Sequence, residues 1–172
     1  MSAITRIITA RTEDDVSIFA REDAIEPMLA GAKLYRVWGW DEAPTLPFAS
    51  PESILPLSMF PAAGGLRVNV AEFPAGMGAN RAAKTNSEAF DRISGAGGDI
   101  EPLDEDPGLH ATDTADIIVV ISGEVSVELD NNVERTIRPG DIMFQMGTIH
   151  AWHNRTSEPC LVALIVVGLE RS

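Results

Sequence analysis

The three histidines of this chain lie in two short segments whose residue types suit metal binding. His110 begins a segment rich in threonine and aspartate, which leads into the apolar run Ile117–Ile121. His150 and His153 close a second segment, which follows the dipeptide Pro139-Gly140. Two imidazoles and a carboxylate that converge from two strands form a ligand set for Fe, Mn, Ni or Zn.

The alternation of side chains along a strand predicts which of these residues share a face. Asp113 and His153 fall on the opposite face from the other polar residues of their segments, and His153 is assigned no role. The residues predicted to point inward together are His110, Thr112, Thr114, Asp116, His150, Trp152 and Asn154.

The two segments resemble the paired signature motifs of the cupin superfamily. In the first motif His110 takes the position of the first histidine, Thr112 that of the second, and Asp116 that of the glutamate. Gln145 stands where the second motif has a proline. The positions that match the second motif are Gly140, Gly147, His150 and Asn154.

This resemblance implies an all-β fold, the cupin jelly roll, with one divalent metal (Fe, Mn, Ni or Zn) held in the barrel lumen by His110, Asp116 and His150. Asp is one methylene shorter than the usual glutamate, and the Thr112 hydroxyl is a weak ligand that suits a metal-bound water better. The residues expected to surround the ligands or contact a substrate are Thr112, Asp113, Thr114, Gln145, Trp152 and Asn154. For Trp152 core packing is the competing role, and for Asp113 a hydrogen bond at the entry to the strand.

Several functions remain open at this point. The first is a small-molecule enzyme that uses Lewis-acid chemistry, as an isomerase, decarboxylase or dehydratase, on an aromatic or polyketide-like substrate. The second is a metal-dependent dioxygenase. The third is a non-catalytic cupin without metal, in which His110 and His150 only hydrogen-bond and the lumen binds a small ligand as a sensor or carrier.

Composition narrows the class of protein. The chain has 172 residues, 45% of them hydrophobic, and no apolar run is long enough to span a bilayer. The net charge of −13 argues against binding to nucleic acid or to an anionic membrane. Cys160 is the only cysteine, which excludes an internal disulfide and fits the cytoplasm.

The order of elements predicts one cupin domain over residues 1–172. Residues 1–75 supply strands that extend one sheet, at 4–9, 33–39 and 66–73. Residues 76–109, rich in glycine and acidic residues, form a partly helical insertion, either a lid or a surface excursion, with a helix at 87–93. Residues 110–172 form the core barrel, with strands at 116–121, 124–129, 133–137, 142–145, 150–154 and 160–167.

The apolar runs at 117–121 and 161–167 have hydrophobic residues on both faces, which predicts burial on both sides. In cupins, N-terminal strands are often exchanged across a two-fold axis. The resemblance therefore also implies a homodimer.

Overall fold

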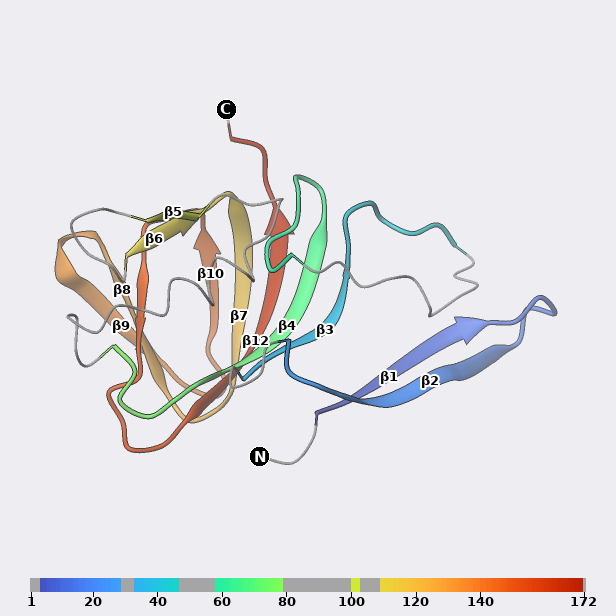
Figure 1. Cartoon of the computed structure of the whole chain (residues 1–172), viewed down its shortest axis with the longest axis horizontal. Helices are drawn as coiled ribbons and strands as arrows, with labels where there is room; N and C mark the ends of the chain where they lie inside the picture. Colours follow the sequence, from blue (N-terminus) through green and yellow to red (C-terminus); the bar gives the residue numbers. More distant parts are fainter. Residues whose placement is uncertain (1–3, 29–32, 47–57, 79–99, 103–108, 172) are drawn as a thin grey trace.

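The computed structural model describes residues 4–28, 33–46, 58–78, 100–102 and 109–171, and Figure 1 shows their arrangement. This part of the chain contains twelve β-strands, all paired antiparallel, and one 3-10 turn at Asp130–Asn132. The strands are β1 (Ile4–Arg11), β2 (Ser17–Ile25), β3 (Leu34–Trp40), β4 (Leu66–Phe73), β5 (Ile100–Pro102), β6 (His110–Thr112), β7 (Thr114–Ser122), β8 (Val125–Leu129), β9 (Val133–Ile137), β10 (Ile142–Met146), β11 (Ala151–His153) and β12 (Cys160–Gly168).

The larger sheet has five strands in the order β10-β7-β12-β4-β3. Its inner face is closely packed, since burial alternates strictly along β12 and Ile118 and Val162 are fully buried. Burial of a side chain of this size stabilises the fold by about 1.5–3 kcal/mol. The inner face of this sheet therefore forms one wall of the core.

The smaller sheet has the order β11-β8-β9 and forms the opposite wall. Val125 and Ile137 of this sheet belong to the same hydrophobic cluster as Ile118 and Val162. A short pair, β5 and β6, continues this wall because His110 of β6 bridges to His150, next to β11. Two facing antiparallel sheets of this kind make the jelly roll predicted from the sequence.

Most strands lie where the sequence predicted them, and β1, β3, β4 and β7 to β12 are confirmed. The prediction missed β2, which carries three charged residues and remains largely exposed. The predicted helix at 87–93 and most of the insertion at 76–109 lie outside the described residues. The described part of the chain contains no helix with the length and hydropathy to cross a membrane.

A glycine is required by the backbone at Gly123, between β7 and β8. Its φ is +75°, and a Cβ there would lie 2.5 Å from the carbonyl oxygen of Pro159. A side chain is disfavoured by both the backbone conformation and the close approach. This glycine lets β7 turn into β8 beneath the start of β12.

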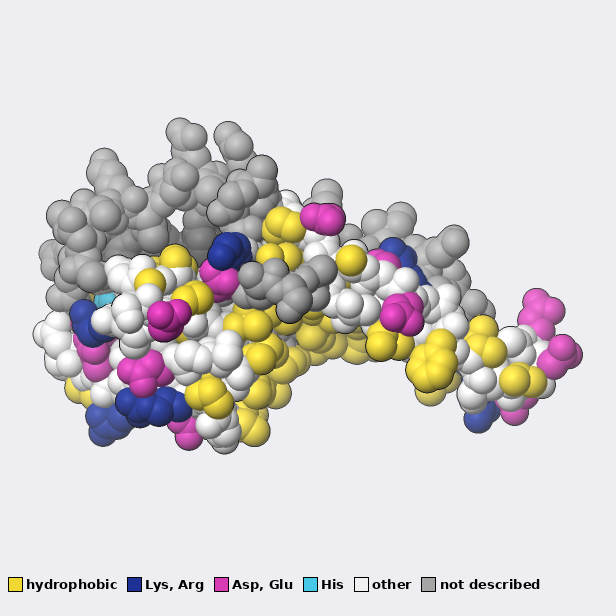
Figure 2. Space-filling view, turned by 90° about the horizontal axis from the view of Figure 1, so that it is seen from below, with side chains coloured by type: hydrophobic (Ala, Val, Ile, Leu, Met, Phe, Trp, Pro, Cys, Tyr) yellow, Lys and Arg dark blue, Asp and Glu magenta, His cyan; other side chains and the backbone are white. Residues whose placement is uncertain are grey.

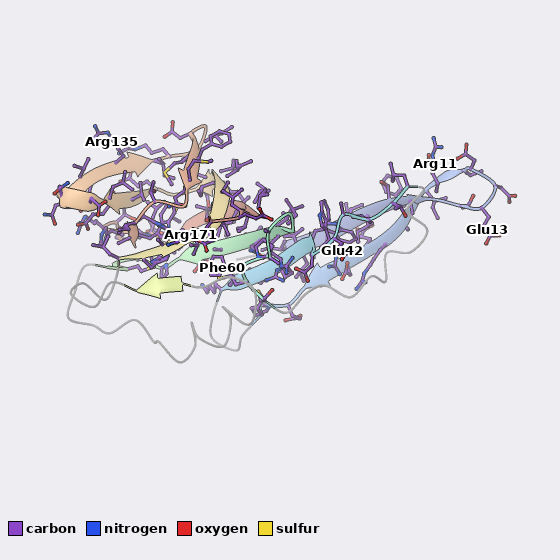
Figure 3. The ribbon with its side chains drawn as sticks, turned by 90° about the horizontal axis from the view of Figure 1, so that it is seen from above. Arg11, Glu13, Glu42, Phe60, Arg135 and Arg171 are labelled. Carbon is purple, nitrogen blue, oxygen red and sulfur yellow. The ribbon has the colours of Figure 1, made fainter. Side chains whose placement is uncertain are left out.

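The hairpin of β1 and β2 forms a separate two-stranded sheet that projects away from the barrel (Figure 1). Arg6 anchors its base, with hydrogen bonds of 2.9 and 2.6 Å to Asp23 and one of 3.2 Å to the carbonyl of Val37. In Figure 3, Arg11 and Glu13 lie at its far tip, at the opposite end of the molecule from Arg135. Phe19 is 80% exposed on this hairpin, and a lone two-stranded hairpin is only marginally stable in water.

Asn154, predicted to face the pocket, ties the loop between β11 and β12 to β4. Its buried amide nitrogen donates to the carbonyls of Phe73 and Glu158, at 2.9 and 2.8 Å. Its oxygen accepts from the backbone N–H and the hydroxyl of Thr156, at 3.0 and 2.7 Å. The side chain thus uses its hydrogen-bonding groups to hold the backbone.

We predict that Asn154→Ala lowers the free energy of unfolding by about 2 kcal/mol or more, because buried backbone groups lose their partners. Urea denaturation at equilibrium measures this change. The control is Ser157→Ala in the exposed part of the same loop, which should change stability by less than about 0.5 kcal/mol. Equal effects of the two substitutions would contradict the role of Asn154.

Candidate active site in the barrel lumen

Two histidines from separate motifs lie side by side in the structure. The backbones of His110 and His150 exchange two hydrogen bonds, each 3.0 Å long. The centroids of their rings are 4.4 Å apart, and the ring planes are tilted by 51°. Directly opposed residues on antiparallel segments hold their side chains on one face, so this pairing presents both imidazoles together.

The surroundings of His150 fix the orientation of its ring. Its Nδ1 lies 2.9 Å from the carbonyl of Thr148, and the amide nitrogen of Gln145 lies 2.5 Å from that carbonyl and 2.9 Å from the Thr148 hydroxyl. The Gln145 nitrogen is also 2.9 Å from Nδ1. These contacts form a consistent set of hydrogen bonds when the Nδ1–H of His150 and the amide N–H of Gln145 both donate to Thr148. Nε2 of His150 then carries a lone pair that is available to a ligand.

His150 is held in its neutral form. Burial, with a smaller contribution from the neighbouring His110, lowers the pKa of His150 to about 4. The neutral imidazole is the form that binds a metal or accepts a proton. Its orientation and its charge state therefore both suit a functional group.

Asp116 lies on the inner face of β7, where its cross-strand neighbours are Gln145 and Val166. Burial raises the pKa of Asp116 to about 6, although a hydrogen bond from Thr114 acts in the opposite direction. Its Oδ1 and the side-chain oxygen of Gln145 are buried and have no hydrogen-bond partner. A buried unpaired acceptor costs about 1–3 kcal/mol, so this part of the lumen is suited to a ligand that brings a donor or a cation.

The remaining residues of the first motif have other contacts. Thr112 and Thr114 are buried, and their hydroxyl oxygens are 2.7 Å apart, so they share a hydrogen bond. Asp113 pairs instead with Arg171, with nitrogen–oxygen distances of 2.7 and 2.6 Å. The structure thus separates Asp113, bound near the C-terminal end of the chain, from the two inward-facing threonines.

An aromatic wall borders the histidine pair. Trp152 stacks on Phe73, with ring centroids 5.2 Å apart and planes 20° from parallel, and both pack against the hydrophobic core. The edge of Trp152 meets the ring of His150 at 5.9 Å, with the planes nearly perpendicular. Trp152 therefore has the core-packing role and also supports His150 from the side.

A second cluster, formed by Glu128, Glu134 and His153, was missed by the sequence analysis. One ligating atom of each residue lies within 4.8 Å of the ligating atoms of the other two. Among the described residues, this is the one group of at least three His, Cys, Asp or Glu residues close enough to hold a metal ion. The ligating atoms of His110, Asp116 and His150 do not all approach one another so closely. As predicted, His153 lies on the opposite face from His150, where its cross-strand neighbour is Ser126. The missed signal was the pair of glutamates facing the same way on two adjacent strands.

Comparison with a protein-family model agrees with this architecture. Residues 99–167 match the model described as Cupin domain, a stretch that contains both motifs. This part of the chain therefore has the sequence of a cupin domain.

Several curated proteins are similar to part of the chain. The Cupin-domain-containing oxidoreductase fogC of Aspergillus ruber is 43% identical over 63 residues, covering 37% of this chain and 30% of that protein. Oryzines biosynthesis cluster protein J of Aspergillus oryzae is 36% identical over 61 residues, covering 36% of this chain and 34% of that protein. Phomopsin biosynthesis cluster protein D of Diaporthe leptostromiformis is 40% identical over 48 residues, covering 28% of this chain and 25% of that protein. The matched segments thus span about a third or less of these relatives.

Solved structures give more distant likenesses. A Cupin 2 conserved barrel domain protein from Salinispora arenicola has a TM-score of 0.43 and 10% identity, covering 83% of this chain and 80% of that one. The DMSP lyase DddQ from Ruegeria pomeroyi has a TM-score of 0.40 and 20% identity, covering 64% of this chain and 43% of that one.

We predict that Asp116 in metal-free protein gains its proton as the pH falls through about 6, because burial disfavours its charged form. Difference infrared spectra of wild-type and Asp116→Asn protein, recorded in the presence of a chelator, follow the carboxyl band. A raised carboxyl pKa lowers folding stability as the pH rises through about 6, and Asp116→Asn should abolish that decline. A carboxyl band that disappears near the ordinary pKa of aspartate would contradict the assignment.

Proposed function

We propose that this protein is a cytoplasmic small-molecule enzyme whose reaction takes place in the barrel lumen, beside His110, His150 and Asp116. The observation that carries the proposal is the adjacent pair of imidazoles, one of them held neutral, near a buried carboxylate with an unpartnered oxygen. Buried groups with shifted pKa values that converge in one place are typical of active sites. We also propose that residues 1–172 form one domain, with 76–109 as an insertion at the mouth of the barrel.

One divalent metal, Fe, Mn, Ni or Zn, would be held by His110 and His150, with Asp116 as the third ligand once its side chain turns towards the pair, because the ligating atoms of the three are not all within 4.8 Å of one another. Two features support this fit: the free lone pair on Nε2 of His150 and the unpartnered Oδ1 of Asp116. The Nδ1–H of a metal-binding histidine commonly donates to a carbonyl, as His150 does to Thr148. When bound, the metal supplies Lewis-acid stabilisation of negative charge on a substrate oxygen.

The protein's own residues have distinct tasks in this proposal. Asp116 would be ionised when it binds the metal, because a ligating carboxylate is deprotonated. Gln145 and Thr148 orient His150. The wall of Trp152 and Phe73 offers an apolar surface to an aromatic or polyketide-like substrate. Together these tasks favour an isomerase, decarboxylase or dehydratase.

Oxygen chemistry is the second candidate function. A two-histidine, one-carboxylate set with open positions also serves Fe(II) oxygenases. The similarity to fogC, a protein named as an oxidoreductase, supports a dioxygenase, although the similarity covers 37% of this chain. The Lewis-acid reaction ranks first, because Thr112 and Asp116 replace the usual histidine and glutamate, whereas a dioxygenase needs a ligand set that tolerates redox cycling.

We further propose that the protein forms a homodimer through the outer face of the larger sheet. One row of cross-strand neighbours on that face is apolar from edge to edge: Phe144, Ile117, Ile165, Val68 and Trp38. On the edge strand β10, Ile142, Phe144 and Met146 are 61%, 65% and 59% exposed. The single chain leaves uncovered a face that the sequence predicted to be buried, which is typical of an interface.

A second copy of this chain is the partner that best fits the apolar outer face of the larger sheet. Figure 2 shows hydrophobic side chains gathered over the middle of one face of the molecule and continuing onto the projecting hairpin. The hairpin exposes Phe19 and Ile7, at 80% and 58%, and has little core of its own. In a two-fold dimer each chain contributes the same sheet face and the same hairpin. One isologous interface would therefore cover both the apolar sheet face and the exposed hydrophobic residues of the hairpin.

We predict that His110→Ala and His150→Ala each reduce the metal bound after loading with Co(II) by about one ion per chain, because each removes a ligand of the lumen site. Inductively coupled plasma mass spectrometry of the dialysed proteins measures the content. His153→Ala is the matched control and should leave the ion in the lumen in place. His110→Ala and His150→Ala proteins that each bind as much metal as the wild type would refute the lumen ligand set.

We predict that Phe144→Glu converts the dimer to a monomer, because it places a charge in the apolar row. Size-exclusion chromatography with light scattering gives the mass. Val133→Glu, at a 48% exposed position of the smaller sheet, is the control and should remain dimeric. A wild-type monomer, or a dimer that survives Phe144→Glu, would be inconsistent with this interface.

A further inference from the structure

Two buried oxygens on the inner face of the larger sheet belong to directly opposed residues. Gln145 of β10 and Asp116 of β7 are cross-strand neighbours, and Gln145 is 3% exposed. Opposed residues on antiparallel strands hold their Cβ atoms about 4.5–5.5 Å apart on one face. Within the described part of the chain, Oε1 of Gln145 and Oδ1 of Asp116 are both without a hydrogen-bond partner. The two residues therefore present neighbouring acceptors in the lumen.

Contacts with Thr148 fix the orientation of the Gln145 amide. Its nitrogen lies 2.5 Å from the carbonyl oxygen of Thr148 and 2.9 Å from the Thr148 hydroxyl. A carbonyl only accepts hydrogen bonds, so the end of the amide that faces it must be the nitrogen. Exchanging the two ends would place Oε1 of Gln145 against that carbonyl. Oε1 consequently points away from Thr148.

The threonines beside Asp116 have no hydrogen left to offer to these oxygens. Thr114 donates a hydrogen bond to the Asp116 carboxylate. The hydroxyl oxygens of Thr112 and Thr114 are 2.7 Å apart, and Thr112 is the donor of that pair because Thr114 has already used its hydrogen. His150 adds no donor, since its Nδ1–H goes to Thr148. The missing hydrogens would therefore come from a bound molecule.

We infer that the lumen recognises its substrate through O–H or N–H donors, which bind Oε1 of Gln145 and Oδ1 of Asp116. This inference rests on the proposed function, because it takes the lumen as the place where the substrate binds. When a metal takes Oδ1 of Asp116, Oε1 of Gln145 remains for the donor.

The inference narrows the substrate class to small molecules that carry a hydroxyl, primary amide or amine group. An analogue in which a methyl group replaces that donor would leave buried oxygens unpaired. A site built to hydrogen-bond a substrate group rejects the analogue that lacks it. Gln145 is thus a specificity-determining residue of the lumen.

Benzamide and acetophenone test this recognition, because they have nearly the same shape and differ in one group, an amide NH2 against a methyl. Both offer a phenyl ring to the wall of Trp152 and Phe73. The full chain is titrated at pH 8 with a chelator, so that Asp116 is ionised and no metal competes for its oxygens. Ligand-observed NMR gives the two Kd values, and benzamide should bind at least about tenfold more tightly.

Two substitutions should remove this preference in different ways. Gln145→Met keeps the length of the side chain but removes the acceptor, so the two affinities should agree within about twofold. Asp116→Asn keeps the shape of the side chain and offers its own N–H to Oε1 of Gln145, which should also abolish the preference. Met143→Leu, on the same face of β10, is the matched control and should retain it.

Equal binding of the two probes to the wild type, binding of neither, or a preference that survives Gln145→Met would overturn the inference. A water trapped on the two oxygens would give equal binding. The ratio of affinities is the readout, because a disturbance of His150 in Gln145→Met affects both probes alike. A lumen that binds metal but does not distinguish the probes would overturn this inference and leave the metal site standing, and a preference without metal binding would do the reverse.

Discussion

The candidate active site depends on one long-range backbone contact, the pair of hydrogen bonds between His110 and His150. The two residues are far apart in the sequence, and each belongs to a short extended segment that is weak by itself. Their pairing joins β5 and β6 to the smaller sheet and sets the register in which the two imidazoles share a face. A shift of the register by one residue would move one ring to the opposite face.

The lumen combines an apolar floor with polar groups that the fold leaves incompletely satisfied. Ile118 and Leu164 belong to the hydrophobic core, whereas Asp116 and Gln145 each keep a buried oxygen without a partner. Such groups cost stability, and a protein retains them where a ligand completes them. The same environment that makes them costly shifts the pKa values of Asp116 and His150 towards useful protonation states.

The sequence predicted the strands and the face of most site residues, because period-two alternation and turn residues are local signals. It did not predict the contact between the histidine rings, or that the ligating atoms of Asp116 and the histidines are not all close together, since both depend on register between distant segments. The cluster at Glu128 was missed for a similar reason, because its glutamates resemble a solvated strand face until three strands are aligned. Strand β2 was missed because its stability does not come from a buried face.

Anomalous X-ray diffraction from crystals of the metal-loaded protein, collected on both sides of the absorption edge of the metal, tests the central claim most directly. We expect an anomalous peak in the lumen, within bonding distance of Nε2 of His150 and of the ring of His110, with Asp116 turned towards it. A lumen without a peak, in which the two histidines bind only protein groups, would contradict the proposed metal site.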